Sequence, residues 1–312
     1  MMVWLSWRQH RVELLTLMAI GLGLAAVMTV VTIEAQSSFG AVRQSCGAIP
    51  GPQCQAVSLN FSSQFTTVFE VFQGALLALP GLAGIFIGAP LLAREFEQGT
   101  ARLVWTQGIT RRRWLAVKLG VVLVVVAAVA TVLGVVGSLM TGTPGGTFDS
   151  RWSSFDLQGL VLGAYLVFGI ALGAAAGAVI RRTVPAMAVT LVAFVAIRVA
   201  IYNWVRPNLL PPLSWDTSKL APNLGDSWNL GQRPVDLSGH PVSDQYYQQL
   251  VANAGALPGS FADYMRSHGV VVLQIYQPEN RFWLFQSMEA SLFVVLAAAL
   301  IGLAVWAIRR AI

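Results

Sequence analysis

The stretch Leu119–Met140 reads LGVVLVVVAAVATVLGVVGSLM and contains no charged side chain. At ~1.5 Å per residue, a helix of this length crosses the ~30 Å hydrocarbon core of a bilayer. Water is absent from that core, so the backbone polar groups must pair within the helix itself. The stretch therefore predicts a transmembrane helix, which we place over residues 117–140.

Five further apolar stretches of similar length predict six spans in total. The expected spans are residues 14–33, 68–91, 117–140, 157–180, 183–204 and 283–308. Only 11% of the residues are charged, against ~25% in a typical soluble domain. The first stretch is longer than the ~7–15 apolar residues of a signal peptide, so we expect it to be a retained span. The sequence thus predicts an all-α integral membrane protein with a single transmembrane domain over residues 1–312.

Basic residues are concentrated on one side of these spans. With the amino terminus in the cytoplasm, the segments 1–13, 94–118, 181–182 and 309–312 hold 12 basic and 3 acidic residues. All other segments together hold 8 basic and 11 acidic residues. The positive-inside rule selects this orientation, with both termini in the cytoplasm. The net charge of +6 then reflects membrane topology, and no nucleic-acid partner is expected.

The segments on the outer side differ in length. Residues 34–66 and 141–156 are expected to form loops, and residues 206–282 a large extracytoplasmic cap between spans five and six. Within the cap, two short helices are predicted near 243–254 and 260–267. The apolar run 269–277 fits either a strand or the lead-in to the last span.

The chain contains two cysteines, Cys46 and Cys54, and both lie in the first outer segment. The Gly and Pro residues between them favour a turn, and an oxidising exterior permits a disulfide. We expect Cys46 and Cys54 to be bonded to each other, the alternative being two free thiols.

Residues 91–118, LLAREFEQGTARLVWTQGITRRRWLAVK, join the second and third spans on the cytoplasmic side. Gly99 and Thr100 are expected to interrupt one helix and cap the next, a short helix over 101–107. Leu92, Phe96 and Leu103 share one helical face, and Arg94, Gln98 and Arg102 lie roughly opposite. Such an element either docks a cytoplasmic partner or anchors acidic lipid headgroups.

Four charges lie near the outer ends of spans. They are Glu34, Glu70, Arg198 and Glu289. Arg198 lies six residues before Trp204 and Glu289 six after Trp283, which suggests that the two share a depth. We expect Arg198 to pair with Glu289, either as a structural ion pair or as part of an outer gate.

Small residues and one proline mark two of the spans. Gly169, Gly173 and Gly177 in the fourth span, and Gly84 and Gly88 in the second, allow close helix packing. Packing inside one subunit is the preferred interpretation, and a dimer contact is the alternative. Pro80-Gly81 predicts a kink in the second span, which is either a hinge or static.

The segment after the second span resembles the permease subunits of type-2 ABC exporters. The pattern R-E-x-E-x-G-T stands here as Arg94-Glu95-Phe96-Glu97-Gln98-Gly99-Thr100, followed by Arg111-Arg112-Arg113 and Lys118. Gly108-Ile109-Thr110 stands where the family typically has Pro before the basic cluster. The six-span layout resembles the family too. The stretches WLSWRQHR (4–11) and, near the sixth span, YQP with RFWLFQ (276–286) are similar to its actinobacterial branch.

This resemblance implies a transport mechanism with separate subunits in a bacterial cell membrane. Two permease chains, expected as a homodimer, would form the export path, and two copies of a cytoplasmic ATPase would drive it with ATP and Mg. The coupling helix would contact that ATPase. The coupling residues implied are Arg94, Glu95, Phe96, Glu97, Gly99, Thr100, Arg102, Leu103 and Val104.

Motifs for enzymatic chemistry are missing from the sequence. It contains no G-x-x-x-x-G-K-[ST], H-E-x-x-H or G-x-S-x-G pattern. We therefore expect no catalytic site, no bound cofactor and no metal site; His240 and His268 with nearby aspartates are a weak metal alternative. A membrane enzyme, or a ligand-binding or structural membrane protein without transport, is the alternative function.

Overall fold

The computed structural model describes residues 2–45, 52–99, 110–140, 151–219, 226–254 and 261–310. Its contacts divide the chain into two compact units. The helical unit comprises Met1–Ile201 and Gln286–Ile312, and the second unit comprises Tyr202–Phe285.

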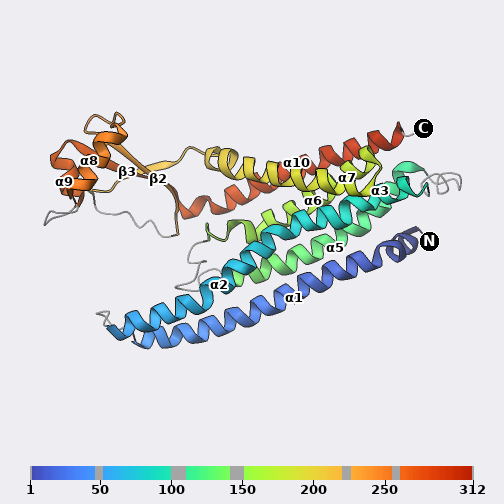
Figure 1. Cartoon of the computed structure of the whole chain (residues 1–312), viewed down its shortest axis with the longest axis horizontal. Coiled ribbons are helices and arrows are strands. Elements are labelled where there is room, and N and C mark those ends of the chain that lie inside the picture. The colour runs from blue at the N-terminus through green and yellow to red at the C-terminus, as the bar shows by residue number, and fades with distance from the viewer. Residues whose placement is uncertain are drawn as a thin grey trace. The chain divides into compact units, whose positions relative to one another are not determined.

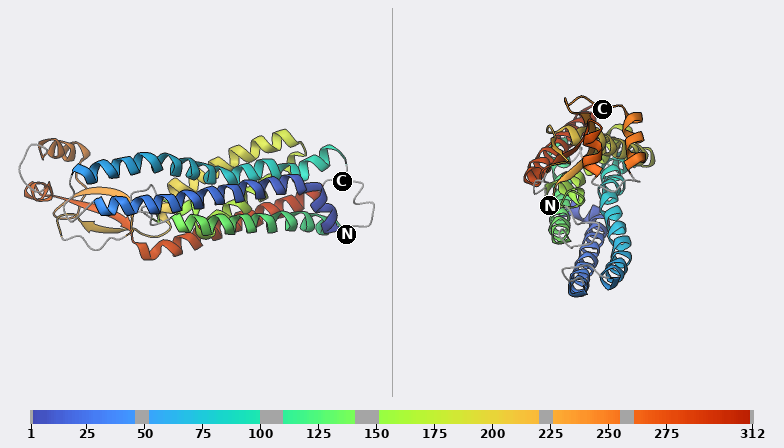
Figure 2. Two further views of the ribbon diagram at one scale, coloured as in Figure 1. Left: turned by 90° about the horizontal axis from the view of Figure 1, so that it is seen from below. Right: turned by 90° about the vertical axis from the view of Figure 1, so that its left-hand side faces the viewer.

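The helical unit is built of long helices and a few short helical segments (Figure 1). They are α1 (Met2–Ser45), α2 (Pro52–Ala83), the π-helical η1 (Gly84–Gly88), α3 (Ala89–Glu97), α5 (Arg111–Met140), the 3-10 turn η2 (Phe155–Leu157), α6 (Gly159–Ile180), α7 (Thr183–Ala200) and α10 (Phe282–Arg309), which enters this unit at Gln286. Six helical runs are long and apolar enough to cross a membrane, which confirms the predicted number of spans. The beginning of α1 and the end of α10 lie at the same end of this unit (Figure 2).

The first outer segment differs from the expected loop. Helix α1 continues to Ser45 and α2 begins at Pro52, so most of residues 34–66 are helical. Phe61, Phe65 and Phe69 recur every four residues on α2 and are buried in one cluster with α1 residues such as Ala35. This apolar stripe packs α2 along α1, and the two helices run side by side (Figure 1).

Glycines bring α6 into backbone contact with η1 and α3. A Cβ atom at Gly177 would lie 2.5 Å from the Ala89 carbonyl oxygen, and one at Gly88 would lie 2.7 Å from the Ile170 carbonyl oxygen. Cβ atoms at Gly169 and Gly173 would also collide with backbone of the second span. The glycine motifs of the second and fourth spans therefore pack on each other within one chain, which agrees with the preferred interpretation of packing inside one subunit.

The second span is interrupted one turn after Pro80. Proline has no N–H to donate to the carbonyl four residues earlier, and the five-residue π-helical segment η1 follows at Gly84–Gly88. The predicted disturbance of this span thus takes the form of a wide helical turn. After it, α3 continues in the same direction to Glu97.

The second unit contains a three-stranded antiparallel sheet (Figure 1). Its strands are β1 (Leu213–Asp216), β2 (Trp228–Asp236) and β3 (Val270–Gln277), in the order β1-β3-β2. The unit also holds η3 (Ile201–Val205), which begins at the last residue of the helical unit, η4 (Arg206–Asn208), α8 (Asp244–Ala254), α9 (Phe261–Ser267) and η5 (Glu279–Arg281). The two predicted cap helices are confirmed, and 269–277 is a strand rather than a lead-in.

A small core supports this sheet. Leu250 of α8, Met265 of α9 and Val270 of β3 form one buried cluster. At Asn229–Gly231 the register of β2 against β3 shifts, and Gly231 takes a φ of 130°, which only glycine adopts without strain.

Candidate functional site

The last turn of α3 contacts four different parts of the helical unit through four consecutive residues. Arg94 Nη1 lies 3.1 Å from Glu13 Oε1 of α1, and Glu95 pairs with Lys118 of α5. The Arg181 guanidinium, just after α6, lies 5.6 Å from the Phe96 ring centroid. Glu97 accepts hydrogen bonds from Thr183 at the start of α7. Successive helical residues point ~100° apart, so one turn reaches partners on every side.

The Glu95–Lys118 pair is the most buried of these contacts. Only 3% of the Lys118 side chain and 12% of the Glu95 side chain are exposed. The Lys118 ammonium also lies 5.0 Å from the Trp114 ring centroid on the same face of α5. A buried ammonium is costly without a partner, so Glu95 is required to keep Lys118 in place.

Glu97 caps a helix that is remote in sequence. The first residue of α7, Thr183, donates its N–H to Glu97 Oε2 at 3.0 Å and its hydroxyl to the same oxygen at 2.7 Å. The N-cap residue of α7, Arg182, makes no side-chain cap of its own. A carboxylate at a helix N-terminus satisfies a free N–H and interacts favourably with the helix dipole.

The structure describes part of the predicted coupling segment. Arg94, Glu95, Phe96, Glu97 and Gly99 are described; Gly99 takes a φ of 71°, consistent with the expected helix break. Thr100, Arg102, Leu103 and Val104 lie outside the described residues, so their roles stay predictions. The described members all make contacts inside the chain, while Arg94 (58% exposed), Glu97 and Gln98 also present exposed side chains.

A second cluster of charges lies among α6, α7 and α10. Arg198 Nη1 lies 3.5 Å from Glu289 Oε1, which confirms the predicted pairing. Arg198 Nη2 also donates to Asp156 Oδ1 at 3.3 Å, and its guanidinium lies 3.7 Å from the Tyr165 ring centroid. The Tyr165 hydroxyl lies 2.8 Å from Asp156 Oδ1 and 2.5 Å from Glu289 Oε1. Glu289 is fully buried, so these contacts replace its hydration.

Glu34 and Glu70 do not join this cluster. They are exposed on α1 and α2, and neither is among the contacts described for Arg198. Asp156 and Tyr165 are the members that the sequence analysis missed. Asp156 was expected to lie in the loop 141–156. The available signal was its position directly before a span, because a carboxylate there can reach charged residues near the ends of neighbouring spans, here Arg198.

Gln286 reinforces the same region. Its Nε2 donates to the Phe155 carbonyl oxygen at 2.7 Å, and its Oε1 accepts the Val161 N–H at 3.2 Å. The side chain is completely buried. It therefore satisfies a free N–H in the first turn of α6 and fixes α10 against η2.

A family model described as ABC-2 membrane transporter related matches residues 18–206, which is more than half of the chain. The chain belongs to this family. No curated protein and no solved structure shows significant similarity to it. The match includes the last turn of α3, the glycine contacts and Arg198, whereas α10 with Glu289 lies beyond it.

The ABC-2 family assigns this chain to the membrane-embedded part of an ABC transporter. The six apolar helices agree with a multi-pass membrane protein. Within this ABC-2 protein, no group of three or more His, Cys, Asp or Glu residues able to hold a metal occurs in the described parts of the chain. His240 instead lies 3.6 Å from Asp236 at the turn after β2.

Proposed function

We propose that the chain is the permease subunit of an ABC exporter, forms the substrate path as a homodimer, and is driven by two copies of a separate ATPase subunit. That subunit would bind and hydrolyse ATP with Mg, because this chain has no nucleotide-binding motif. The family match supports the transport class. Export rather than import rests on the resemblance to type-2 exporters.

One observation carries the coupling assignment: the turn that precedes Gly99 contacts α1, α5, the end of α6 and α7 at once. A force applied by an ATPase to the segment after Glu97 would reach four membrane helices through side chains in direct contact. Coupling between distant sites needs such a physical connection to elements that move. We therefore propose residues 94–104 as the contact with the ATPase.

The test is co-purification of a co-expressed ABC ATPase with the tagged chain, together with ATP hydrolysis after reconstitution. Replacing both Glu97 and Arg102 with Ala should weaken co-purification or uncouple hydrolysis from transport, with membrane insertion retained. Since Glu97 also caps α7, Thr183→Val is the matched control: it removes the hydroxyl contact and keeps the carboxylate. Normal ATPase binding and transport by the double variant would contradict the coupling role and leave residues 94–104 as an anchor for lipid headgroups.

Topology and the cysteines belong to the same proposal. With both termini in the cytoplasm, labelling of introduced cysteines should place residues 206–282 outside and residues 94–118 inside. Cys54 lies in α2, and Cys46 lies outside the described residues, so the disulfide stays a prediction. Both thiols should resist alkylation until reduced; prompt labelling of both in native membranes would contradict the disulfide.

A further inference from the structure

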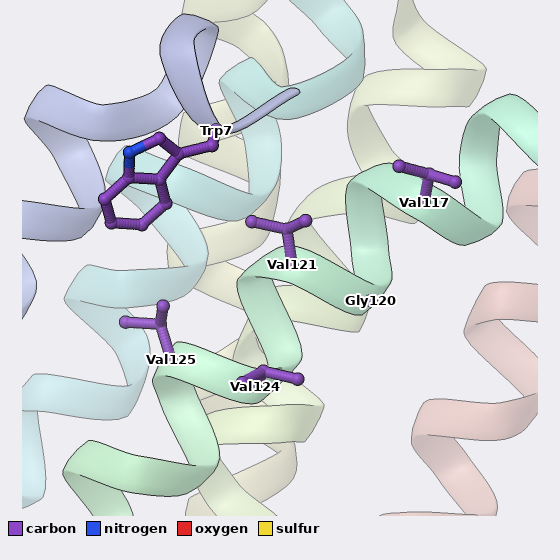
Figure 3. Close-up of a pocket in the computed structure, with 6 residues that line it drawn as sticks. All are labelled: Trp7, Val117, Gly120, Val121, Val124 and Val125. Atoms are coloured by element: carbon purple, nitrogen blue, oxygen red, sulfur yellow. The ribbon is translucent and has the colours of Figure 1, made fainter. Parts of the chain in front are cut away.

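An apolar groove of ≈ 470 Å³ lies between α1 and α5. Its lining consists of Trp7 of α1 and one face of α5: Val117, Gly120, Val121, Val124 and Val125. Figure 3 shows the Trp7 indole on the side of α5 that carries Val121 and Val125. The spacing of the α5 residues at three and four positions is that of a single helical face.

Gly120 creates the hollow in this groove. A Cβ atom built there meets nothing within 4 Å, so the space above it is open. Val124, one turn further along, is 71% exposed. Trp7, Gly120 and Val124 lie within two helical runs that are long and apolar enough to span a membrane, so we expect the groove to face the bilayer rather than water.

Exposed basic side chains lie at the end of the groove where α1 and α5 begin. Arg113 is exposed and lies one helical turn before Val117, on the same face of α5. Arg8 and Arg11 are exposed on α1, next to Trp7 and one turn after it. The Arg8 guanidinium lies 5.2 Å from the ring centroid of Trp4, an aromatic residue typical of a membrane surface. An apolar slot is thus combined with several positive charges.

We propose that this groove binds one acyl chain of an anionic phospholipid whose headgroup lies among Arg8, Arg11 and Arg113. The slot admits a hydrocarbon chain, because its lining is almost entirely apolar and would not compensate a buried headgroup. Lipid tails are as apolar as valine, so the tail alone gives no preference between lipids. The arginines supply that preference, because each basic residue near the surface favours an anionic headgroup by roughly fivefold.

The leaflet concerned is the one that faces the first turns of α1 and α5. The proposal therefore depends on neither the cytoplasmic orientation nor an ATPase partner. Binding at this site differs from a general attraction of basic residues to anionic membranes, because it requires an acyl chain in the groove as well as an anionic headgroup near the arginines.

The experiment compares the lipids that the full-length purified chain retains by native mass spectrometry, with palmitoyl-oleoyl phosphatidylglycerol and the matching phosphatidylcholine as probes. Gly120→Leu fills the groove, and the open space at this position keeps the variant compatible with the fold. Gly302→Leu is its matched control, since a Cβ at this exposed glycine of α10 also meets nothing within 4 Å. Arg113→Gln removes one charge, and Arg310→Gln removes one at the end of α10.

We expect the chain to retain phosphatidylglycerol in preference to phosphatidylcholine. Gly120→Leu should lower that retention at least tenfold and Arg113→Gln roughly fivefold, with both control variants unchanged. Phosphatidylglycerol with brominated tails should quench a component of the tryptophan fluorescence that is missing in Trp7→Phe, which identifies the contact among the ten tryptophans.

Three results would overturn the proposal. Equal retention of the two lipids would remove the headgroup preference. Unchanged retention by Gly120→Leu would place the lipid elsewhere on the protein. A change of oligomeric state in Gly120→Leu, without loss of phosphatidylglycerol, would show that a second copy of the chain occupies the groove.

Discussion

Glu97 and Thr183 are 86 residues apart in sequence, yet one carboxylate oxygen of Glu97 accepts both the backbone N–H and the hydroxyl proton of Thr183. The contact joins the end of α3 to the beginning of α7. It gives Glu97, an acidic residue of the proposed coupling segment, a defined partner inside the chain, in addition to any partner in the proposed ATPase.

Replacing Glu97 with Ala should therefore loosen the first turn of α7. The loss of a capping acceptor typically costs ~1 kcal/mol of helix stability, so amide hydrogen exchange in residues 183–186 should accelerate about fivefold. Gln98→Ala, at the exposed neighbouring position, is the control and should leave exchange there unchanged. Equal protection in the two variants would mean that the cap contributes nothing.

Replacing Gly173 with Ala should destabilise the helical unit. The added methyl group would collide with Gly84 and lie 2.6 Å from the Ala89 nitrogen, so α6 must move away from η1 and α3. Overpacking of this kind costs ~1–3 kcal/mol, and thermal unfolding in detergent should shift to lower temperature. Gly302→Ala, where the methyl group meets nothing, should unfold like the original chain. Similar melting of the two variants would contradict the close contact.

Removing one member of the Arg198–Glu289 pair should cost more than removing both. Arg198→Leu leaves Glu289, fully buried, without its cation, and such losses amount to ~3–5 kcal/mol. The double change Arg198→Leu with Glu289→Leu should recover part of that loss. Additive effects in the double-mutant cycle would show that the two side chains are energetically independent.

The turn after β2 should respond to acid through Asp236. Its carboxylate accepts the His240 N–H at 2.9 Å and the N–H and hydroxyl of Ser238 at 2.8 and 2.9 Å. These hydrogen bonds lower the pKa of Asp236, and the bond from the His240 backbone N–H contributes most. A folded-state pKa below the ordinary value of 3.8 stabilises the folded protein at pH values above that value, and this stabilisation is lost as the pH falls through the folded-state pKa.

Asp236→Asn should therefore flatten the acid dependence of hydrogen exchange in this turn below about pH 4, while the difference between the two proteins is constant at neutral pH. The measurement is exchange of the Ser238 and His240 amides across this pH range. Parallel profiles for the two proteins would exclude a contribution from ionised Asp236.

The spans were predictable because each is a long apolar run with at most one charged residue, and helices are the structure that such runs adopt in a bilayer. The helical continuation of α1 and α2 was missed because its polar residues resemble a loop. The signal was the four-residue spacing of Phe61, Phe65 and Phe69, whose burial against α1 appears only when both helices are in place. Strand β1 was missed because it has only four residues, and β2 because it contains Gly231 and Pro234, which are unfavourable in a strand.

The charged residues show the same limit. Pairing of Arg198 with Glu289 followed from their similar distance to aromatic residues, since a membrane charge requires a partner. Which further groups complete the cluster depends on how the helices pack, and nothing in the sequence placed the Tyr165 hydroxyl between two carboxylates. The internal partners of Arg94, Glu95 and Glu97 also come from three separate helices, α1, α5 and α7, so spacing alone did not reveal them.

The wide turn η1 determines which way the end of α3 points. A π-helical turn holds about one more residue than an α-helical turn, and one residue corresponds to ~100° of rotation. Deleting a single residue from 84–88 would rotate Arg94, Glu95, Phe96 and Glu97 by about a quarter-circle, so each would face the neighbour of its present partner. The alignment of α3 with the surrounding helices is therefore encoded a full two turns earlier, by an irregularity in the helix and not by the residues that make the contacts.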